Sequence, residues 1–209
     1  MLFETIVVGA LGVNCFILGD KQSNEGVVVD PGADCDLILD AVTRFGIKIK
    51  YIVNTHGHFD HVGCNRSLKE KTGAELLIHQ GDQKLLELAA KSAQKYGLSV
   101  EDSPAPTRFL EDGMKLEFGR RSIEVLHTPG HTQGGCCLLL AHEKLVITGD
   151  TLFADSVGRT DLPGGSHEQL MASIKAKLMP LPDDTTVWPG HGPSSTIGRE
   201  RRENPYINE

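Results

Sequence analysis

The sequence YIVNTHGHFDH, residues 51–61, carries the most information about this chain. The apolar run Tyr51-Ile52-Val53 is followed within a few residues by three imidazoles and a carboxylate: His56, His58, Asp60 and His61. Neutral His nitrogen and Asp oxygen are ligands that borderline and hard divalent ions prefer. No thiolate lies among these residues, whereas closed structural zinc sites rely on Cys. The stretch therefore predicts a metal site that carries out chemistry.

The spacing within this cluster indicates more than one ion. On a chain leaving a strand, His56 and His58 project to the same side because side chains alternate with a period of two. Asp60 and His61 follow in a turn and can face a second ion. One short segment could therefore serve two metals.

Composition limits the kinds of partner. With 209 residues, of which 39% are hydrophobic and 23% charged, the chain falls in the ordinary globular range, and we expect one domain, residues 1–209. The net charge of -7 and the lack of any Lys/Arg run longer than a pair argue against a nucleic-acid partner. No window approaches 18 consecutive apolar residues, and the opening has no basic region before its apolar stretch. We therefore expect no membrane partner and a cytoplasmic location.

The cysteines are odd in number and show no CxxC spacing. Cys136 and Cys137 are adjacent in an expected strand, so their side chains point to opposite faces and are poorly placed to pair. We expect all five to be reduced and mostly buried, which implies a reducing compartment. They are Cys15, Cys35, Cys64, Cys136 and Cys137.

Hydrophobic periodicity predicts two β-rich halves, each with helices. Expected strands cover residues 5–8, 14–18, 27–29, 49–53, 75–78, 114–118, 122–126, 136–141, 145–148 and 185–188. Expected helices cover residues 34–45, a segment ending at Lys71, residues 82–96, and residues 166–179, the last beginning with the capping box Ser166/Gln169. We interpret residues 98–107 as a loop within the domain. The pattern predicts two packed sheets with helices outside.

Further candidate ligands follow other expected strands. His131 lies in HTPGH (residues 127–131), Asp150 in TGD (148–150) and His191 in PGH (189–191). Each motif also contains glycine, which lets backbone pass close to a crowded site. If these strand ends meet on one rim, they complete the metal site of the first cluster.

The motifs THGHFDH, HTPGHT, TGDTLF and PGHG, in this order and at these spacings, resemble the metallo-β-lactamase superfamily. Within it, VGRTDLPGGSHEQLMASI and WPGHGPSSTIGRERRENPYI are similar to the short, single-domain glyoxalase II-like branch, the hydroxyacylglutathione hydrolase-like proteins. The resemblance implies an α/β fold, a four-layer αββα sandwich with a two-metal site on one edge. It also implies that His56, His58 and His131 hold one ion, that Asp60, His61 and His191 hold the other, and that Asp150 bridges them. A β-lactamase of the superfamily usually has another residue at the position of His61, which counts against that activity.

The resemblance implies hydrolysis of an S-acyl thioester, most of all a hydroxyacylglutathione such as S-lactoylglutathione. Two cations lower the pKa of a water enough to supply hydroxide near neutral pH, with Asp60 and Asp150 holding the metals and available to relay protons. Mixed imidazole and carboxylate ligands suit zinc, with iron and manganese as alternatives. Arg159 matches the position of a basic residue that receives a glutathione carboxylate in similar enzymes. Asp161 departs from the aromatic hydroxyl expected shortly after it, and the chain lacks the C-terminal helical domain of the longer enzymes.

Other functions fit the same residues. A persulfide dioxygenase of this fold uses one iron held by two His and one Asp, a set contained in the one present here. Lactone or phosphodiester hydrolysis and a non-enzymatic metal-binding module are further alternatives. We expect structural roles for His79, His142 and His167, and either packing or support of a ligand for His127. The sequence leaves the oligomeric state open.

Overall fold

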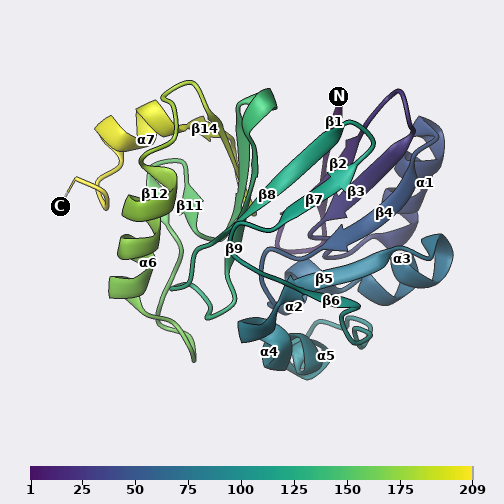
Figure 1. Ribbon diagram of the computed structural model, residues 1–209. Coiled ribbons are helices and arrows are strands. Elements are labelled where there is room, and N and C mark those ends of the chain that lie inside the picture. The colour runs from purple at the N-terminus through teal and green to yellow at the C-terminus, as the bar shows by residue number, and fades with distance from the viewer. Residues whose placement is uncertain (209) are drawn as a thin grey trace.

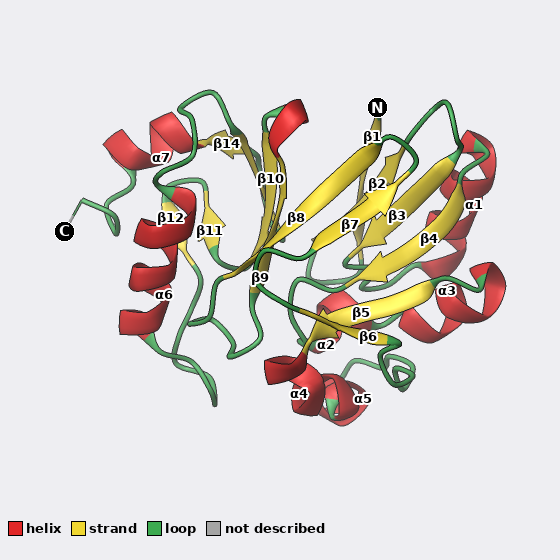
Figure 2. Ribbon diagram, viewed as in Figure 1, coloured by secondary structure: helices red, strands yellow, loops and turns green. Residues whose placement is uncertain are grey.

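The computed structural model describes residues 1–208 and contains two six-stranded sheets packed face to face, with helices on both outer sides (Figures 1 and 2). The first sheet has the order β1-β2-β3-β4-β5-β6. Its first three strands are antiparallel, and β3 to β6 run parallel. The strands are β1 (Leu2–Val8), β2 (Val13–Gly19), β3 (Glu25–Val29), β4 (Lys48–Val53), β5 (Glu75–His79) and β6 (Arg108–Leu110).

The second sheet has the order β14-β13-β10-β9-β8-β7, and a small hairpin pairs β11 with β12. Within the second sheet β10 and β13 are parallel, and the other pairs are antiparallel. The strands are β7 (Lys115–Phe118), β8 (Arg121–His127), β9 (Cys136–Leu140), β10 (Leu145–Gly149), β11 (Leu152–Phe153), β12 (Ser156–Val157), β13 (Thr186–Pro189) and β14 (Ser195–Thr196).

Three layers of apolar contact hold the structure together. Phe16 and Val53 of the first sheet pack with Phe118 and Ile147 of the second to form the central core. The outer face of the first sheet packs against α1 (Cys35–Phe45) and α3 (Asn65–Thr72), and that of the second against α6 (His167–Ser173), the π-helical turn Ile174–Leu178 and α7 (Ile197–Glu203). The predicted four-layer αββα sandwich is therefore confirmed. Among residues 1–208, no helix has the length and apolar character needed to span a bilayer.

The predicted helix over residues 82–96 is wrong as a single element. The chain forms a short 3₁₀ turn (Gln80–Asp82), then α4 (Gln83–Glu87) and α5 (Ala89–Gln94), which lie beside α2 (Phe59–Val62). The break is at Leu88, whose N–H is shared between the carbonyls of Lys84 and Leu85. The bend lets Leu86, Ala89 and Ala93 all pack on α2 and Ile78.

Most other elements match their predictions, but the shortest ones were missed. The helix over residues 34–45 forms and ends at Gly46 in the left-handed conformation, φ 64°. The helix over residues 166–179 begins as predicted, with Ser166 Oγ accepting from the Gln169 N–H, but its second half is the π-helical turn. Missing from the prediction were α2, where a turn was expected, and β6, the β11–β12 hairpin, β14 and α7, which have two to seven residues each. Such short segments present too little periodicity to detect.

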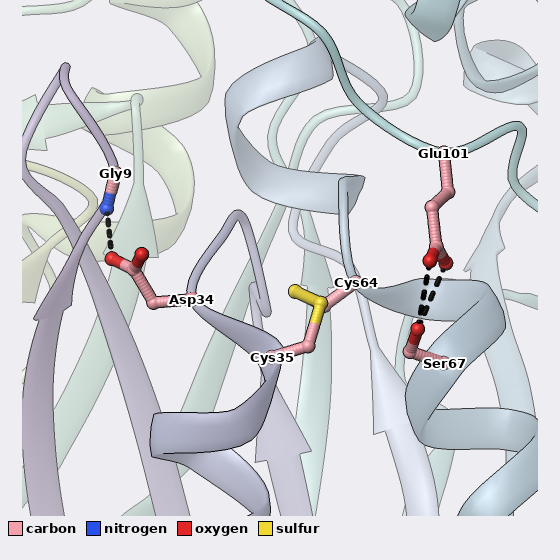
Figure 3. The surroundings of a disulfide bond; sticks show 6 residues. All are labelled: Gly9, Asp34, Cys35, Cys64, Ser67 and Glu101. Carbon is pink, nitrogen blue, oxygen red and sulfur yellow. Dashed lines mark hydrogen bonds between the residues drawn. A yellow bond between two sulfur atoms is a disulfide. The ribbon is translucent and has the colours of Figure 1, made fainter.

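The prediction that all five cysteines are reduced is wrong for one pair. Cys35, at the start of α1, forms a disulfide with Cys64, which precedes α3, and their Cα atoms are 5.4 Å apart. Figure 3 shows this disulfide at the N-terminal ends of the two helices. The pairing depends on the packing of α1 against α3, which brings together residues 29 positions apart. Cys15, Cys136 and Cys137 are free and buried as predicted, but the cysteines no longer support a reducing compartment.

Candidate metal centre

The candidate ligands from both halves of the sequence meet on one rim of the sandwich. His56, His58, Asp60 and His61 follow β4, whereas His131 lies between β8 and β9, and Asp150 and His191 follow β10 and β13. Their potential ligand atoms form three overlapping groups, each with all atoms within 4.8 Å of one another: His56/His58/His131, Asp60/His61/His191, and His56/His61/Asp150. The structure thus brings together every metal ligand predicted from the sequence.

The first group consists of the imidazoles of His56, His58 and His131. His131 Nε2 lies 3.0 Å from His58 Nδ1, and the ring of His56 is within 5 Å, centroid to centroid, of both others. Burial, reinforced by the neighbouring imidazoles, lowers the pKa of His58 to about 3 and that of His56 well below its usual value. Both rings are therefore neutral at pH 7 and have a lone pair available for a cation.

The second group, Asp60, His61 and His191, contains a carboxylate. His61 Nε2 is 3.7 Å from Asp60 Oδ2, and His191 Nε2 is 3.4 Å from the same oxygen. Burial opposes ionisation of His61, but Asp150, Asp30 and Asp60 outweigh it and raise its pKa to about 10. The carboxylates thus stabilise positive charge at this position. A divalent ion could supply that charge in place of the proton on His61.

Asp150 lies between the two groups. Its Oδ1 is 3.6 Å from His61 Nε2, and its Oδ2 is 3.7 Å from His131 Nε2 and 3.8 Å from His191 Nε2. One carboxylate therefore faces imidazoles of both groups, which is the position that a bridging ligand requires.

Three of the candidate ligand atoms have no hydrogen-bond partner among residues 1–208. Within the described residues, His56 Nε2, His61 Nε2 and Asp150 Oδ1 are buried without a hydrogen bond. Leaving a buried polar atom unsatisfied costs about 1–3 kcal/mol, so three such atoms converging on one space call for a ligand. The residues present therefore fit a metal centre.

Hydrogen bonds to the remote ring nitrogens orient the imidazoles. The Nδ1 atoms of His131 and His191 lie 2.8 and 3.0 Å from the carbonyl oxygens of Arg159 and Leu11. His61 Nδ1 lies 3.0 Å from Asp30 Oδ2. Because each of these oxygens accepts a hydrogen bond from Nδ1–H, a neutral ring in this position carries its lone pair on Nε2, which faces the centre.

Asp30 was missed by the sequence analysis. It is completely buried, and besides His61 it accepts from the backbone N–H of Thr55 at 2.7 Å and from the Thr55 hydroxyl at 2.6 Å. It thus fixes both the start of the metal-binding segment and one of its rings. Its place directly after the apolar run of β3 was a signal, because the same pattern identified His56 and Asp150.

Asp82 is a second buried carboxylate that the sequence did not single out. Its Oδ2 accepts from the Gly57 N–H at 2.9 Å and from the Thr132 hydroxyl at 2.7 Å, and its Oδ1 accepts from the Gly134 N–H at 2.7 Å. Asp82 therefore ties the His56–His58 segment to the loop that carries His131. No local sequence signal marks it.

Glycine is required where backbone passes closest to the centre. A Cβ on Gly190 would overlap Asp150 Oδ1 and lie 2.8 Å from His61 Cε1. A Cβ on Gly32 would overlap the Asp60 carbonyl oxygen. Any larger residue at either position would displace a candidate ligand.

Arg159, predicted to bind substrate, lies near the centre but is already paired. Its guanidinium is 59% exposed and makes a two-pronged contact with Asp161, at 2.7 and 2.8 Å. Its carbonyl accepts from His131, a contact that the sequence could not reveal. A substrate carboxylate would have to compete with Asp161 for this side chain.

The remaining histidines lie outside the three groups. His127 stacks on His79 with ring centroids 3.9 Å apart, and its Nε2 contacts the Gln133 carbonyl, so it packs beside the His131 loop. His142 is exposed in the turn between β9 and β10, and His167 begins α6.

Comparisons of the sequence with known proteins identify similar full-length relatives. One is an uncharacterised protein of Aquifex aeolicus, 41% identical over all of this chain and 98% of its own length. Another is the hydroxyacylglutathione hydrolase GloC of Haemophilus influenzae, 38% identical over all of this chain and 99% of its own.

Solved structures with the same fold include proteins of different described activity. The BLEG-1 B3 metallo-β-lactamase has a TM-score of 0.92 and 33% identity, with both chains fully covered. TTHA1623 in a di-iron-bound form has a TM-score of 0.90 and 38% identity, over 97% of this chain and 99% of that one. ETHE1 from Myxococcus xanthus has a TM-score of 0.83 and 27% identity, over all of this chain and 86% of that one.

The sequence model of the metallo-β-lactamase superfamily matches residues 8–191, a range that contains all seven converging ligands. With the two-sheet fold and these relatives, the match shows that this chain belongs to the metallo-β-lactamase superfamily.

Proposed function

We propose that this chain is a metal-dependent hydrolase of S-acyl thioesters whose site holds two divalent ions. In this proposal His56, His58 and His131 hold one ion, Asp60, His61 and His191 hold the other, and Asp150 bridges them. The observation that carries the proposal is the convergence of all seven side chains, with three buried donor atoms left without partners. The ligand set suits zinc, and iron and manganese as well.

Two bound ions would polarise the substrate carbonyl and supply hydroxide near neutral pH. The Asp60 side chain is 16% exposed, so its carboxylate lies at the centre and also contacts solvent. It is therefore placed to take a proton from the attacking water and release it to solvent. Asp150, equally close to both groups, is the second candidate for this role. A thiolate leaving group needs little protonation, so a thioester suits a site without a strong general acid.

For the thiol part of the substrate we propose glutathione. The full-length similarity to a hydroxyacylglutathione hydrolase supports this choice, and Arg159 supplies a cation near the centre for a substrate carboxylate. We also propose that residues 1–209 act as one domain, because residues of both sheets share a single core cluster.

The test is to measure metal per chain and then cleavage of S-lactoylglutathione. A two-metal thioesterase is expected to bind two ions per chain and to release glutathione. His61→Ala should bind one ion fewer and lose most of this activity, whereas His142→Ala, an exposed histidine away from the site, should change neither. If His61→Ala were as active as the unaltered chain, the two-metal mechanism would be wrong.

A second function that the ligand set allows is persulfide dioxygenation with one iron. Its ligand set, two His and one Asp, is contained in the seven residues here. Oxygen uptake with glutathione persulfide, together with one iron per chain and no thioester cleavage, would establish this function instead. Because a B3 β-lactamase is also similar, a β-lactam belongs in the same assay panel.

A further inference from the structure

A small apolar pocket lies beside the second ligand group. Its volume is 160 Å³, and its walls come from the tip of the β1–β2 hairpin, from α2 and from the loop that follows α5. The larger apolar side chains that line it are Val8, Leu11, Val13, Phe59, Leu98 and Val100. None of the sequence motifs pointed to this pocket.

The pocket lies against the metal centre, because the two share a residue. Asp60, a candidate ligand, also lines the pocket. The carbonyl of Leu11, on the rim, accepts from Nδ1 of His191, another candidate ligand, at 3.0 Å. A substrate group bound at Asp60 and His191 would therefore have this pocket as its nearest apolar surface.

Two hydrogen bonds near the Cys35–Cys64 disulfide hold the walls of the pocket in place. Figure 3 shows the Cys35–Cys64 disulfide between two hydrogen bonds. In the first, the Gly9 N–H of the hairpin tip donates to Asp34 at 2.8 Å. In the second, the Ser67 hydroxyl of α3 donates to Glu101, beside the Val100 wall, at 2.9 Å. The hairpin tip and the loop after α5 are thus each hydrogen-bonded to a segment next to the disulfide. The pocket is therefore already formed without a bound ligand.

Size and charge restrict what the pocket can accept. A cavity of about 150 Å³ lined by apolar side chains holds a molecule the size of benzene, so this volume suits a group of about six carbon atoms. The only ionisable residue among those that line it is the acidic Asp60. The described lining residues offer no cationic side chain to pair with an anionic glutathione group, whereas an uncharged aliphatic chain would bury apolar surface.

Building on the proposed thioester hydrolysis, we propose that this pocket receives the acyl chain of the substrate and favours unsubstituted aliphatic acyl groups of about four to six carbons. In the reaction, water oxygen forms a bond to the acyl carbon and the C–S bond breaks. The products are a carboxylate, a thiol and one released proton. The thiol part of the substrate then extends away from the pocket.

The test compares kcat/KM of the metal-loaded chain across S-acylglutathiones from acetyl to decanoyl. A fully buried methylene is worth about a factor of four, and because the pocket is open to solvent we expect roughly a tenfold rise from acetyl to hexanoyl, with no further rise beyond it. Leu11→Asp should bring the ratio of kcat/KM for the hexanoyl substrate to kcat/KM for the acetyl substrate close to one. Leu37→Asp is the matched control, since Leu37 is equally exposed (51% against 49%) but lies on α1, and it should keep the unaltered ratio.

The possible failures are distinguishable. If the thioesters are cleaved but kcat/KM does not change with chain length, or if Leu11→Asp keeps the unaltered ratio, the acyl pocket is wrong and the proposed function stands. If no thioester is cleaved, both proposals fall. Competitive inhibition by hexanoate at concentrations well below those needed for acetate, weakened by Leu11→Asp and not by Leu37→Asp, would support the pocket through binding alone.

Discussion

The two ligand groups of the candidate centre differ in charge and in the buried carboxylate that holds their ligands in position. The first contains only imidazoles, of which burial keeps His56 and His58 neutral, and the carboxylate of Asp82 joins the two segments that carry the three rings. The second contains Asp60, has His61 surrounded by three carboxylates, and depends on Asp30 for the orientation of that ring. Imidazoles alone suit borderline ions such as zinc, while added carboxylates suit harder ions. The difference predicts that the two positions bind ions with different affinity and can be perturbed one at a time.

The largest effect should come from removing a ligand of the first group. His58→Ala leaves His56 and His131 with too few donors for a tightly held ion, so we expect one ion per chain and a loss of roughly 10³-fold in kcat/KM, equivalent to about 4 kcal/mol of transition-state stabilisation. Elemental analysis and thioester kinetics would measure both. His142→Ala is the control, and a His58→Ala protein with two ions and unchanged activity would refute this assignment.

A smaller, selective effect is expected from Asp30→Asn. The amide keeps the size of the carboxylate but loses the charge that holds the Nδ1 proton of His61, so the ring is less firmly presented through Nε2. Loss of such a supporting partner typically costs 10- to 100-fold in metal affinity. Titration of metal-free protein should show the larger loss at the ion of the second group, because Asp30 contacts His61 directly and reaches His56 only through Thr55. Equal weakening of both ions would mean that the two groups do not act separately.

Asp82→Asn is the reciprocal change, also at a completely buried carboxylate. Asp82 contacts no candidate ligand ring and acts through Gly57, Thr132 and Gly134, so we expect about a tenfold loss, smaller than for Asp30→Asn, confined to the ion of the first group. The same titration measures it. If Asp82→Asn lowered the affinity for the same ion as Asp30→Asn, the proposal that each carboxylate mainly supports a different ligand group would be wrong.

The sequence predicted the ligands well because their signal is local. Each lies in a segment that follows a strand, and strand ends of a packed sandwich meet on a rim. Asp30 had the same position after β3 but stood alone, without neighbouring histidines. Asp82 could not be found, because its partners are 25 to 52 residues away and only the packing of α4 and the His131 loop brings them to it. The Cys35–Cys64 pair was missed for the same reason: the docking of α1 on α3 creates the contact.

The disulfide should give the smallest effect on activity and a clear effect on stability. It closes the loop from residue 35 to residue 64, which includes the His56–His61 segment, and its removal in Cys35→Ala/Cys64→Ala should lower the free energy of unfolding by roughly 2–4 kcal/mol. Urea unfolding with and without a thiol reductant gives an internal control, since the reductant should destabilise the unaltered chain but not the double variant. Because Cys64 lies three residues after His61 and its N–H donates to the Pro31 carbonyl, any accompanying loss of metal affinity should fall on the second group. A loss confined to the first group would show that the disulfide supports the other side of the centre.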